Sequence, residues 1–215
     1  MEANSRNVPT VERLQAQYQE AVEKLQKALP TINLVPVQMH AALAVLDGLR
    51  PKFERERNYL QQVAPVISAP VSHSKLQATW DKVLAVADRN GVPRSSLVVL
   101  ACLSVVAIPK GRSSAKTLLK LRAQYTPKEA YNALADLRSL EFLIALFAMD
   151  PTRAVQLWTK DKDLALFWAG IQATNFRRIS KTELGHTLSP ITNLIPASML
   201  TKWRDAIREA SLGGE

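Results

Sequence analysis

The chain has 215 residues, of which 47% are apolar and 22% are charged, as in a soluble globular protein with a core of its own. The longest apolar run, 97–108, has 12 residues, whereas a helix needs about 20 to cross a bilayer, so a membrane span is excluded. The first ten residues contain no apolar segment of the kind that a secretory signal needs. The single cysteine, Cys102, excludes an internal disulfide, and we expect a cytoplasmic, reducing compartment.

The net charge of +9 originates in one segment of the chain. Residues 1–88 carry 10 basic and 9 acidic side chains, and residues 129–215 carry 10 of each. Residues 89–128 carry 8 basic side chains and no acidic one. Because exposed helices ordinarily interleave both signs, this acid-free segment predicts a surface that attracts polyanions.

Residues 10–29 form the first predicted helix. Their apolar side chains recur at spacings of three and four and so form one stripe, while Thr10 and Pro30 are suited to begin and end a helix. The stripe packs either on the chain's own domain or on another subunit, which makes residues 11–29 a candidate contact of a homo-oligomer. We expect residues 1–35 to form this N-terminal arm and residues 36–215 to form a helical core domain.

A second helical region is expected at 37–63, with a break or kink at Gly48 and Pro51. Residues 64–71 contain two prolines and no helical period, so they are expected to be a connection. It leads to a helix that Ser74 begins with a capping box.

Gln77 would complete that capping box, and Gly91 stands where a left-handed residue would end the helix. The following run, 97–108, is apolar on every side. Its valines would suit a strand, but its length and the helices on both sides favour a central buried helix.

Thr126, Pro127 and Glu129 have the pattern of a helix start, with a cap, a proline at the first position and an acid that closes a capping box. The helix should end at Asp150–Pro151, and the segment TRAVQLW should form a short helix after it. A largely buried segment, DLALFWAGIQATNF, then begins at Asp163.

Residues 180–183 match a further capping box, and an amphipathic helix is expected at 198–210. No segment shows the convincing alternation of a strand. The sequence therefore predicts an all-α protein, a single compact multi-helix domain of about eight or nine helices around central apolar ones. The N-terminal amphipathic helix is a candidate arm.

The chain contains no recognisable catalytic or metal-binding motif. Residues 111–117 resemble a P-loop, but Ala115 stands where that motif needs a second glycine. Ser113 and Lys116 match the Ser-x-x-Lys pair of acylating enzymes, whose companion motifs are missing. The three histidines and Cys102 lack the spacing of metal ligands. We predict a protein that is not an enzyme and has no cofactor, metal or small-molecule substrate.

A helix over 115–125 would place Leu118 and Tyr125 toward the core, with Lys116 and Lys120 about 40° apart on the opposite side. The result is a basic ridge, with hydroxyls and backbone N–H groups at its N-terminal end, and phosphates bind such a mixture.

A second basic run follows Phe176 in the segment NFRRISK. If both runs lie on one side, Phe176 becomes the aromatic wall of a groove that suits single-stranded nucleic acid. The predicted nucleic-acid-binding residues are Lys110, Arg112, Lys116, Lys120, Arg122, Arg177, Arg178 and Lys181.

The expected function is non-catalytic binding to the phosphate backbone of single-stranded RNA or DNA, by fold-level analogy with nucleocapsid or coat proteins. Two other interpretations of the ridge stay open. It is either a solvated face, paired with acids such as Glu129, Asp136 or Glu141, or a surface for an acidic protein or a membrane. The alternative function is a helical protein–protein interaction or scaffold module that uses residues 11–28 as a partner helix and has no role with nucleic acid.

Overall fold

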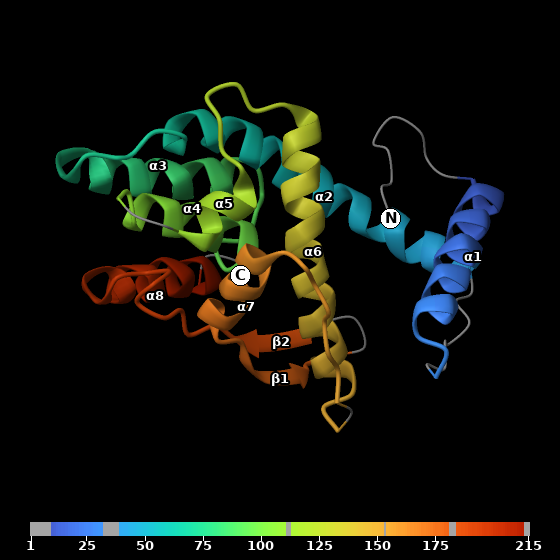
Figure 1. Cartoon of the computed structure of the whole chain (residues 1–215). Coiled ribbons are helices and arrows are strands. Elements are labelled where there is room, and N and C mark those ends of the chain that lie inside the picture. Colours follow the sequence, from blue (N-terminus) through green and yellow to red (C-terminus); the bar gives the residue numbers. More distant parts are fainter. Residues whose placement is uncertain (1–9, 32–38, 111–112, 153, 181–183, 213–215) are drawn as a thin grey trace. The chain divides into compact units, whose positions relative to one another are not determined.

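Eight α-helices, one 3-10 turn and one β-hairpin make up the described part of the computed structural model, and these elements confirm the predicted all-α class (Figure 1). The structure describes residues 10–31, 39–110, 113–152, 154–180 and 184–212. Contacts divide the chain into two units, Met1–Glu54 and Arg55–Glu215. The predicted boundary between residues 35 and 36 lies outside the described residues. Within them, no helix is long and apolar enough to cross a membrane.

Helix α1, Val11–Ala28, belongs to the first unit and confirms the predicted N-terminal helix. The Thr10 hydroxyl accepts a hydrogen bond of 3.3 Å from the backbone N–H three residues on, which caps the helix. The apolar stripe is covered unevenly, because Leu14 is buried whereas Leu25 is 46% exposed, as is Leu29, the residue that caps the C-terminus of the helix. The C-terminal half of the stripe is therefore open to solvent.

Helix α2, Met39–Ile67, is continuous through Gly48 and Pro51, so of the predicted break or kink the break is wrong. A proline inside a helix removes one hydrogen bond and strains the preceding turn, but tertiary packing further along α2 outweighs that cost. The helix also includes residues 64–67, which were expected to be a connection. The reason is burial at helical spacing of Tyr59, Leu60, Val63, Ala64 and Ile67.

The 3-10 turn His73–Lys75 leads into α3, Leu76–Arg89, and the predicted capping box is wrong. The Ser74 hydroxyl instead lies 3.2 Å from that of a neighbouring serine, and Gln77 donates a hydrogen bond to a carboxylate one turn on. Gly91 adopts a φ of 61°, which confirms the left-handed residue expected after this helix.

Helix α4, Leu97–Ala107, is buried along its whole length, and this confirms a central helix rather than a strand. The Ser96 hydroxyl accepts a hydrogen bond of 3.4 Å from the Val99 backbone N–H and so caps the helix. Helices α3, α5 and α6 all contact α4.

Helix α5, Ser114–Leu119, is much shorter than the predicted helix 115–125, which is therefore wrong beyond Leu119. Lys120 adopts the left-handed conformation, with φ 49° and ψ 43°, and ends the helix. The chain then turns without regular structure until the next helix begins.

Helix α6, Pro127–Met149, begins with the predicted capping box. The Thr126 hydroxyl accepts a hydrogen bond of 3.2 Å from the Glu129 N–H, and the Glu129 carboxylate accepts one of 2.8 Å from the Thr126 N–H. The helix ends at Asp150, as predicted.

The short helix predicted after Pro151 is absent, because residues 154–159 have no regular structure. Helix α7, Lys162–Ile171, follows and begins one residue earlier than expected. The Asp161 carboxylate caps it by accepting hydrogen bonds of 2.9 Å from two backbone N–H groups.

The prediction of no strand is wrong for the segment that follows α7. Gln172 has a φ of 43° and ends the helix, and β1, Thr174–Arg178, then pairs antiparallel with β2, Leu184–Thr187. Helix α6 contacts both strands. A strand thus stands where the capping box at 180–183 predicted a helix, while residues 181–183 lie outside the described part.

Helix α8, Ala197–Leu212, confirms the last predicted helix. Its described apolar face buries Met199 and Trp203. The Lys202 ammonium lies 5.1 Å from the centre of the Trp80 ring and therefore joins α8 to α3.

A buried ion pair links α2 to α6 inside the second unit. Arg138 Nη2 lies 2.9 Å from Glu56 Oε2, and the two side chains are only 12% and 3% exposed. Arg138 also pairs with Glu141 one turn along α6. Breaking such a buried pair costs far more than breaking an exposed one, because the remaining charge stays in a medium that solvates it poorly.

We expect Arg138→Met to lower the free energy of unfolding by about 3–5 kcal/mol, because it removes the cation that the buried Glu56 carboxylate faces. The double variant Glu56→Gln/Arg138→Met should recover part of that loss. Urea unfolding followed by circular dichroism measures both. As the control, Arg208→Met removes an exposed pair with Asp205 at 3.7 Å and should cost less than about 1 kcal/mol. Equal losses for the two arginine variants would contradict the importance of the buried pair.

Candidate nucleic-acid interface

Four predicted or neighbouring cations gather around the connection between α5 and α6, and we call this group the basic turn: Lys116, Lys120, Arg122 and Lys128. Lys116 is half-buried and the other three are exposed. They no longer form one helical ridge, because α5 ends before Lys120. They remain close along the chain, since the Lys120 N–H donates to the Lys116 carbonyl at 3.1 Å.

Two carboxylates on α6 partly neutralise the basic turn, as the solvated-face interpretation expects. Arg122 Nε lies 3.4 Å from Glu129 Oε1. Hydrogen bonds from the Thr126 backbone and side chain, followed by the charge of Arg122, hold the pKa of Glu129 below its usual range. Glu129 thus interacts with Arg122, and Asp136 interacts with Lys120, while Lys116 and Lys128 complete the group, so its cations outnumber these two carboxylates.

Asp136 ties the basic turn to the face of α6 that lies below it. Burial raises the pKa of the Asp136 carboxyl, the Lys120 ammonium acts to lower it, and the Asp161 carboxylate acts to raise it. Lys120 and the N-terminal cap of α7 are therefore both within electrostatic reach of Asp136.

The structure describes three of the other predicted basic residues, Lys110, Arg177 and Arg178. Lys110 is exposed and lies before α5 in the sequence, whereas the residues of the basic turn lie within α5 or after it. Arg112 and Lys181 lie outside the described residues. The P-loop-like segment has no free hydroxyl at Ser113, because this buried side chain caps α5 by accepting from the Lys116 N–H at 3.4 Å.

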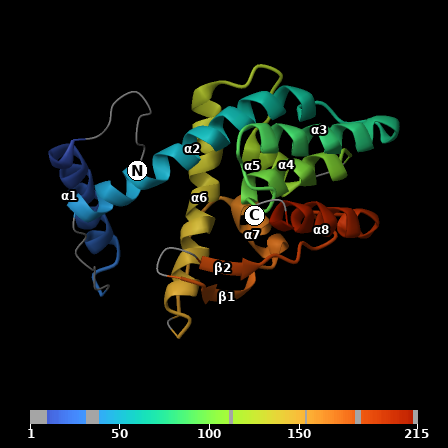
Figure 2. The same ribbon diagram turned by 180° about the vertical axis from the view of Figure 1, so that it is seen from behind.

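Arg177 and Arg178 lie on β1, at the opposite end of α6 from the basic turn (Figures 1 and 2). Both are exposed, and Arg178 donates to the Ser180 carbonyl at 3.1 Å. The ring of Phe176 stacks on the ring of Phe147. Phe147 lies eighteen residues after Glu129 on α6, so the two residues are about 27 Å apart along the helix axis. The two basic runs are thus not direct neighbours.

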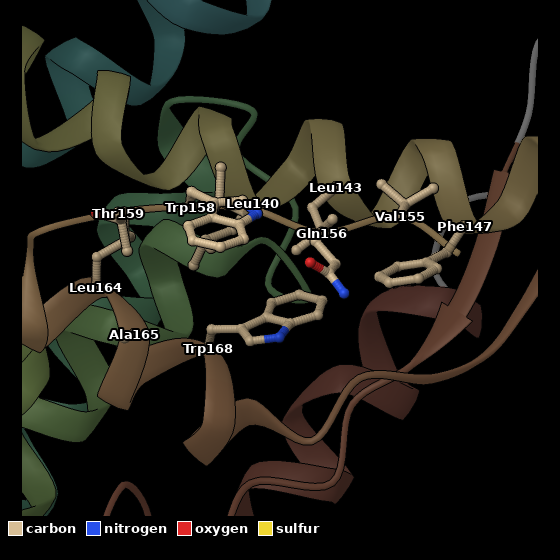
Figure 3. Close-up of a pocket in the computed structure, with 11 residues that line it drawn as sticks. Leu140, Leu143, Phe147, Val155, Gln156, Trp158, Thr159, Leu164, Ala165 and Trp168 are labelled. Atoms are coloured by element: carbon tan, nitrogen blue, oxygen red, sulfur yellow. The ribbon is translucent and has the colours of Figure 1, made fainter. Parts of the chain in front are cut away.

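An apolar cleft of about 350 Å³ lies along α6 between these two basic regions (Figure 3). Helix α6 forms one wall, α7 forms another, and the irregular segment 155–159 crosses between them. The lining residues are Leu140, Leu143, Phe147, Val155, Gln156, Leu157, Trp158, Thr159, Leu164, Ala165 and Trp168.

Aromatic rings continue from the cleft to the hairpin. The Phe147 ring lies 6.4 Å from the Trp168 ring, centre to centre, and the planes are 12° from parallel. The Phe147 ring also stacks on the Phe176 ring of β1, with 5.0 Å between the ring centres. Trp158, on the crossing segment, is 88% exposed and contributes almost nothing to the core. Phe176 is thus the last member of a longer aromatic wall.

The cleft and the basic turn share one face of α6. Asp136, Leu140, Leu143 and Phe147 are spaced by four, three and four residues, so they point in nearly the same direction. From Asp136 to Phe147 this face runs about 16 Å. The basic turn, the cleft and the hairpin are therefore consecutive along α6.

The sequence analysis did not predict this cleft. A helix over TRAVQLW would have predicted Trp158 on a packed face, whereas the irregular backbone exposes it. The available signal was local: Trp158 stands among Gln156, Thr159 and Lys160, a polar setting in which a buried tryptophan is uncommon.

The residues considered for nucleophilic or metal chemistry have structural settings. Burial raises the pKa of the Cys102 thiol to about 12, although a hydrogen bond with Tyr59 acts to lower it, so the thiolate does not form at neutral pH. Among the described residues, no three His, Cys, Asp or Glu side chains are grouped to hold a metal ion. Comparison with protein-family models, curated proteins and solved structures finds no match for this chain.

We expect Lys120→Gln to raise the pKa of Asp136 further, because it removes the cation that favours the charged carboxylate. A carboxyl whose pKa is raised by folding contributes stability below the pKa of the unfolded chain and loses it as the pH rises through the folded value. Carbon NMR titration of the Asp136 carboxyl measures the shift. Lys128→Gln is the control with the same charge change, and an unchanged titration in Lys120→Gln would contradict the link between basic turn and cleft face.

Proposed function

We propose that the chain is a non-catalytic nucleic-acid-binding protein that contacts the phosphate backbone of a single strand through the basic turn. The observation that carries this proposal is the concentration of positive charge in residues 89–128, which contribute +8 to the net charge of +9. Lys120, Arg122 and Lys128 from that segment are exposed.

The side chains of the basic turn suit a chain of phosphates better than a single anion that requires one fixed binding geometry. Lysine ammoniums on flexible stems contact successive phosphates as point charges and do not require one ligand geometry. Such contacts carry no sequence information, because bases are not read by the backbone. RNA and DNA strands are therefore equally valid probes, and a nucleocapsid-like or coat-like role is the biological setting that this chemistry suits.

We expect a fluorescent single-stranded 20-mer to bind with an affinity that falls linearly with salt on logarithmic axes, because phosphates release counterions when lysines replace them. The variant Lys116→Gln/Lys120→Gln should reduce the slope by about 1.4, since each contact with a single strand contributes about 0.7. Fluorescence anisotropy from low to high salt gives the affinity and the slope for RNA and for DNA.

The matched control is Lys75→Gln/Lys82→Gln, which removes the same charge from two exposed positions on and before α3. Equal slopes for both double variants would assign the salt dependence to net charge alone. Absence of binding by the unchanged protein would make the basic turn a solvated face and overturn the proposal.

A specific observation favours a second function, a helical scaffold that assembles through α1. Leu25 lies on the apolar stripe of α1, Leu29 is the residue that caps its C-terminus, and each is 46% exposed. The nearby charge of Lys24 does not oppose pairing of two α1 helices, because its ammonium forms an ion pair of 2.5 Å with Glu20 on the same helix. A second copy's α1 would cover the stripe as in a short coiled coil.

If α1 mediates assembly, Leu25→Gln/Leu29→Gln should convert an oligomer to a monomer in light scattering coupled to gel filtration, without nucleic acid present. Both side chains are exposed, so the change should leave folding intact. The control, Glu23→Gln/Lys27→Gln, changes the polar side of the same helix. A monomer at every concentration in the unchanged protein would contradict this second function.

A further inference from the structure

We propose that the cleft along α6 binds unpaired nucleobases of the strand whose phosphates the basic turn contacts. This inference rests on the proposed function and adds to it a site for the bases. Its residues are the rings of Trp158, Trp168 and Phe147 and the side-chain amide of Gln156 (Figure 3).

The size and shape of the cleft suit a small planar group. A volume of about 350 Å³ lies at the lower end of ligand pockets in proteins, which span roughly 300–1,000 Å³. The cleft lies between two helices and a segment without regular structure, and it opens to solvent where Trp158 of its lining is 88% exposed, so a ligand there can remain part of a chain.

The aromatic rings supply the surfaces on which bases stack. Phe147 and Trp168 are nearly parallel, and Phe147 also stacks on Phe176. Trp158 is 88% exposed and leaves the faces of its indole available. Every nucleobase has a π-face, so such a platform accepts strands of any sequence, in keeping with backbone recognition by the basic turn.

Polar groups in the cleft match the edges of bases. The Gln156 amide extends from the crossing segment into the space beside the Trp168 indole (Figure 3). An amide carries both a donor and an acceptor and can pair with a base edge. Thr159 adds a hydroxyl to the same lining.

Cations at both ends select a polyanionic occupant over an apolar peptide. Lys120 is within reach of Asp136 on the same face of α6, one turn before Leu140 of the cleft. Lys160 and Lys162 are exposed just beyond Trp158 along the chain. Arg177 is exposed next to Phe176 at the hairpin. A strand lying along α6 would thus meet cations before, beside and after its stacked bases.

Three nearby carboxyl groups have partners or surroundings within the fold. The Asp161 carboxylate accepts hydrogen bonds of 2.9 Å from two backbone N–H groups, so it is engaged in capping α7. Burial raises the pKa of Asp136, which disfavours its charged form. Glu141 is paired with Arg138.

The test compares a single-stranded uridine 20-mer with an abasic strand of the same length and charge, using the full chain. We expect Trp158→Ala to weaken binding of the uridine strand about tenfold and to leave binding of the abasic strand unchanged. The unchanged protein should prefer the uridine strand by a similar factor. Because Trp158 is 88% exposed, its replacement should not affect folding, and circular dichroism checks this.

Phe142→Ala is the matched control, since Phe142 is a 46% exposed aromatic residue on α6 that does not line the cleft. It should bind both strands like the unchanged protein. Equal binding of the two strands, with no effect of Trp158→Ala, would overturn the base site while leaving backbone binding at the basic turn intact. Failure of both strands to bind would overturn the proposed function and the base site together.

A third result would also overturn the base site. If Trp158→Ala leaves both affinities unchanged but converts an oligomer to a monomer, the cleft is a contact between copies of this chain. Light scattering of the same samples without nucleic acid gives this result directly. Quenching of tryptophan emission by the uridine strand that decreases in Trp158→Phe, while Trp168 remains in the cleft, would in turn support direct stacking on the Trp158 indole.

Discussion

The second unit depends on one constraint, the burial of helix α4 on every side. All eleven of its residues are buried, so this helix has no face that water can solvate and other elements must surround it. Helices α3, α5 and α6 make those contacts. The charged residues next to α4 in the sequence are thereby confined to its connections, where Arg94 pairs with Asp88 at 2.8 Å and Lys110 is exposed. The basic segment is thus partly a consequence of what the buried helix excludes.

The turn after α5 shows how a buried side chain directs cations to the surface. The Tyr125 hydroxyl donates to the Leu119 carbonyl at 2.6 Å, and this bond satisfies a carbonyl at the end of α5. Because Tyr125 is buried while the chain between it and α5 is irregular, the residues between them face outward. Arg122 is exposed in this stretch. A polar contact inside the core therefore shapes the charged surface outside it.

Local signals in the sequence were sufficient for most helices and insufficient for the site. The Thr126 cap and the apolar run of α4 predicted their elements correctly, because each signal acts within one or two helical turns. The ends of α5 and α7 have no such signal in the sequence. Lys120 and Gln172 adopt the left-handed backbone conformation although neither is glycine, so we attribute these helix ends to tertiary packing. These two chain reversals create the basic turn and the hairpin. The relation between them along α6 could not be inferred from spacing.

A contribution to folding stability does not explain why a tryptophan stands at position 158. An indole that is 88% exposed gains little from removal of apolar surface from water, and folding would proceed as well with a polar residue there. Its neighbours in the cleft differ, because Leu140, Leu164 and Phe147 contribute to packing between α6 and α7 whether or not a ligand binds. Single exposed apolar residues are common on protein surfaces. Here, however, the exposed ring borders a cleft with other rings and a polar amide, between cations at both ends of one helix face. Because of that combination, we propose a binding surface here rather than an incidental exposed side chain.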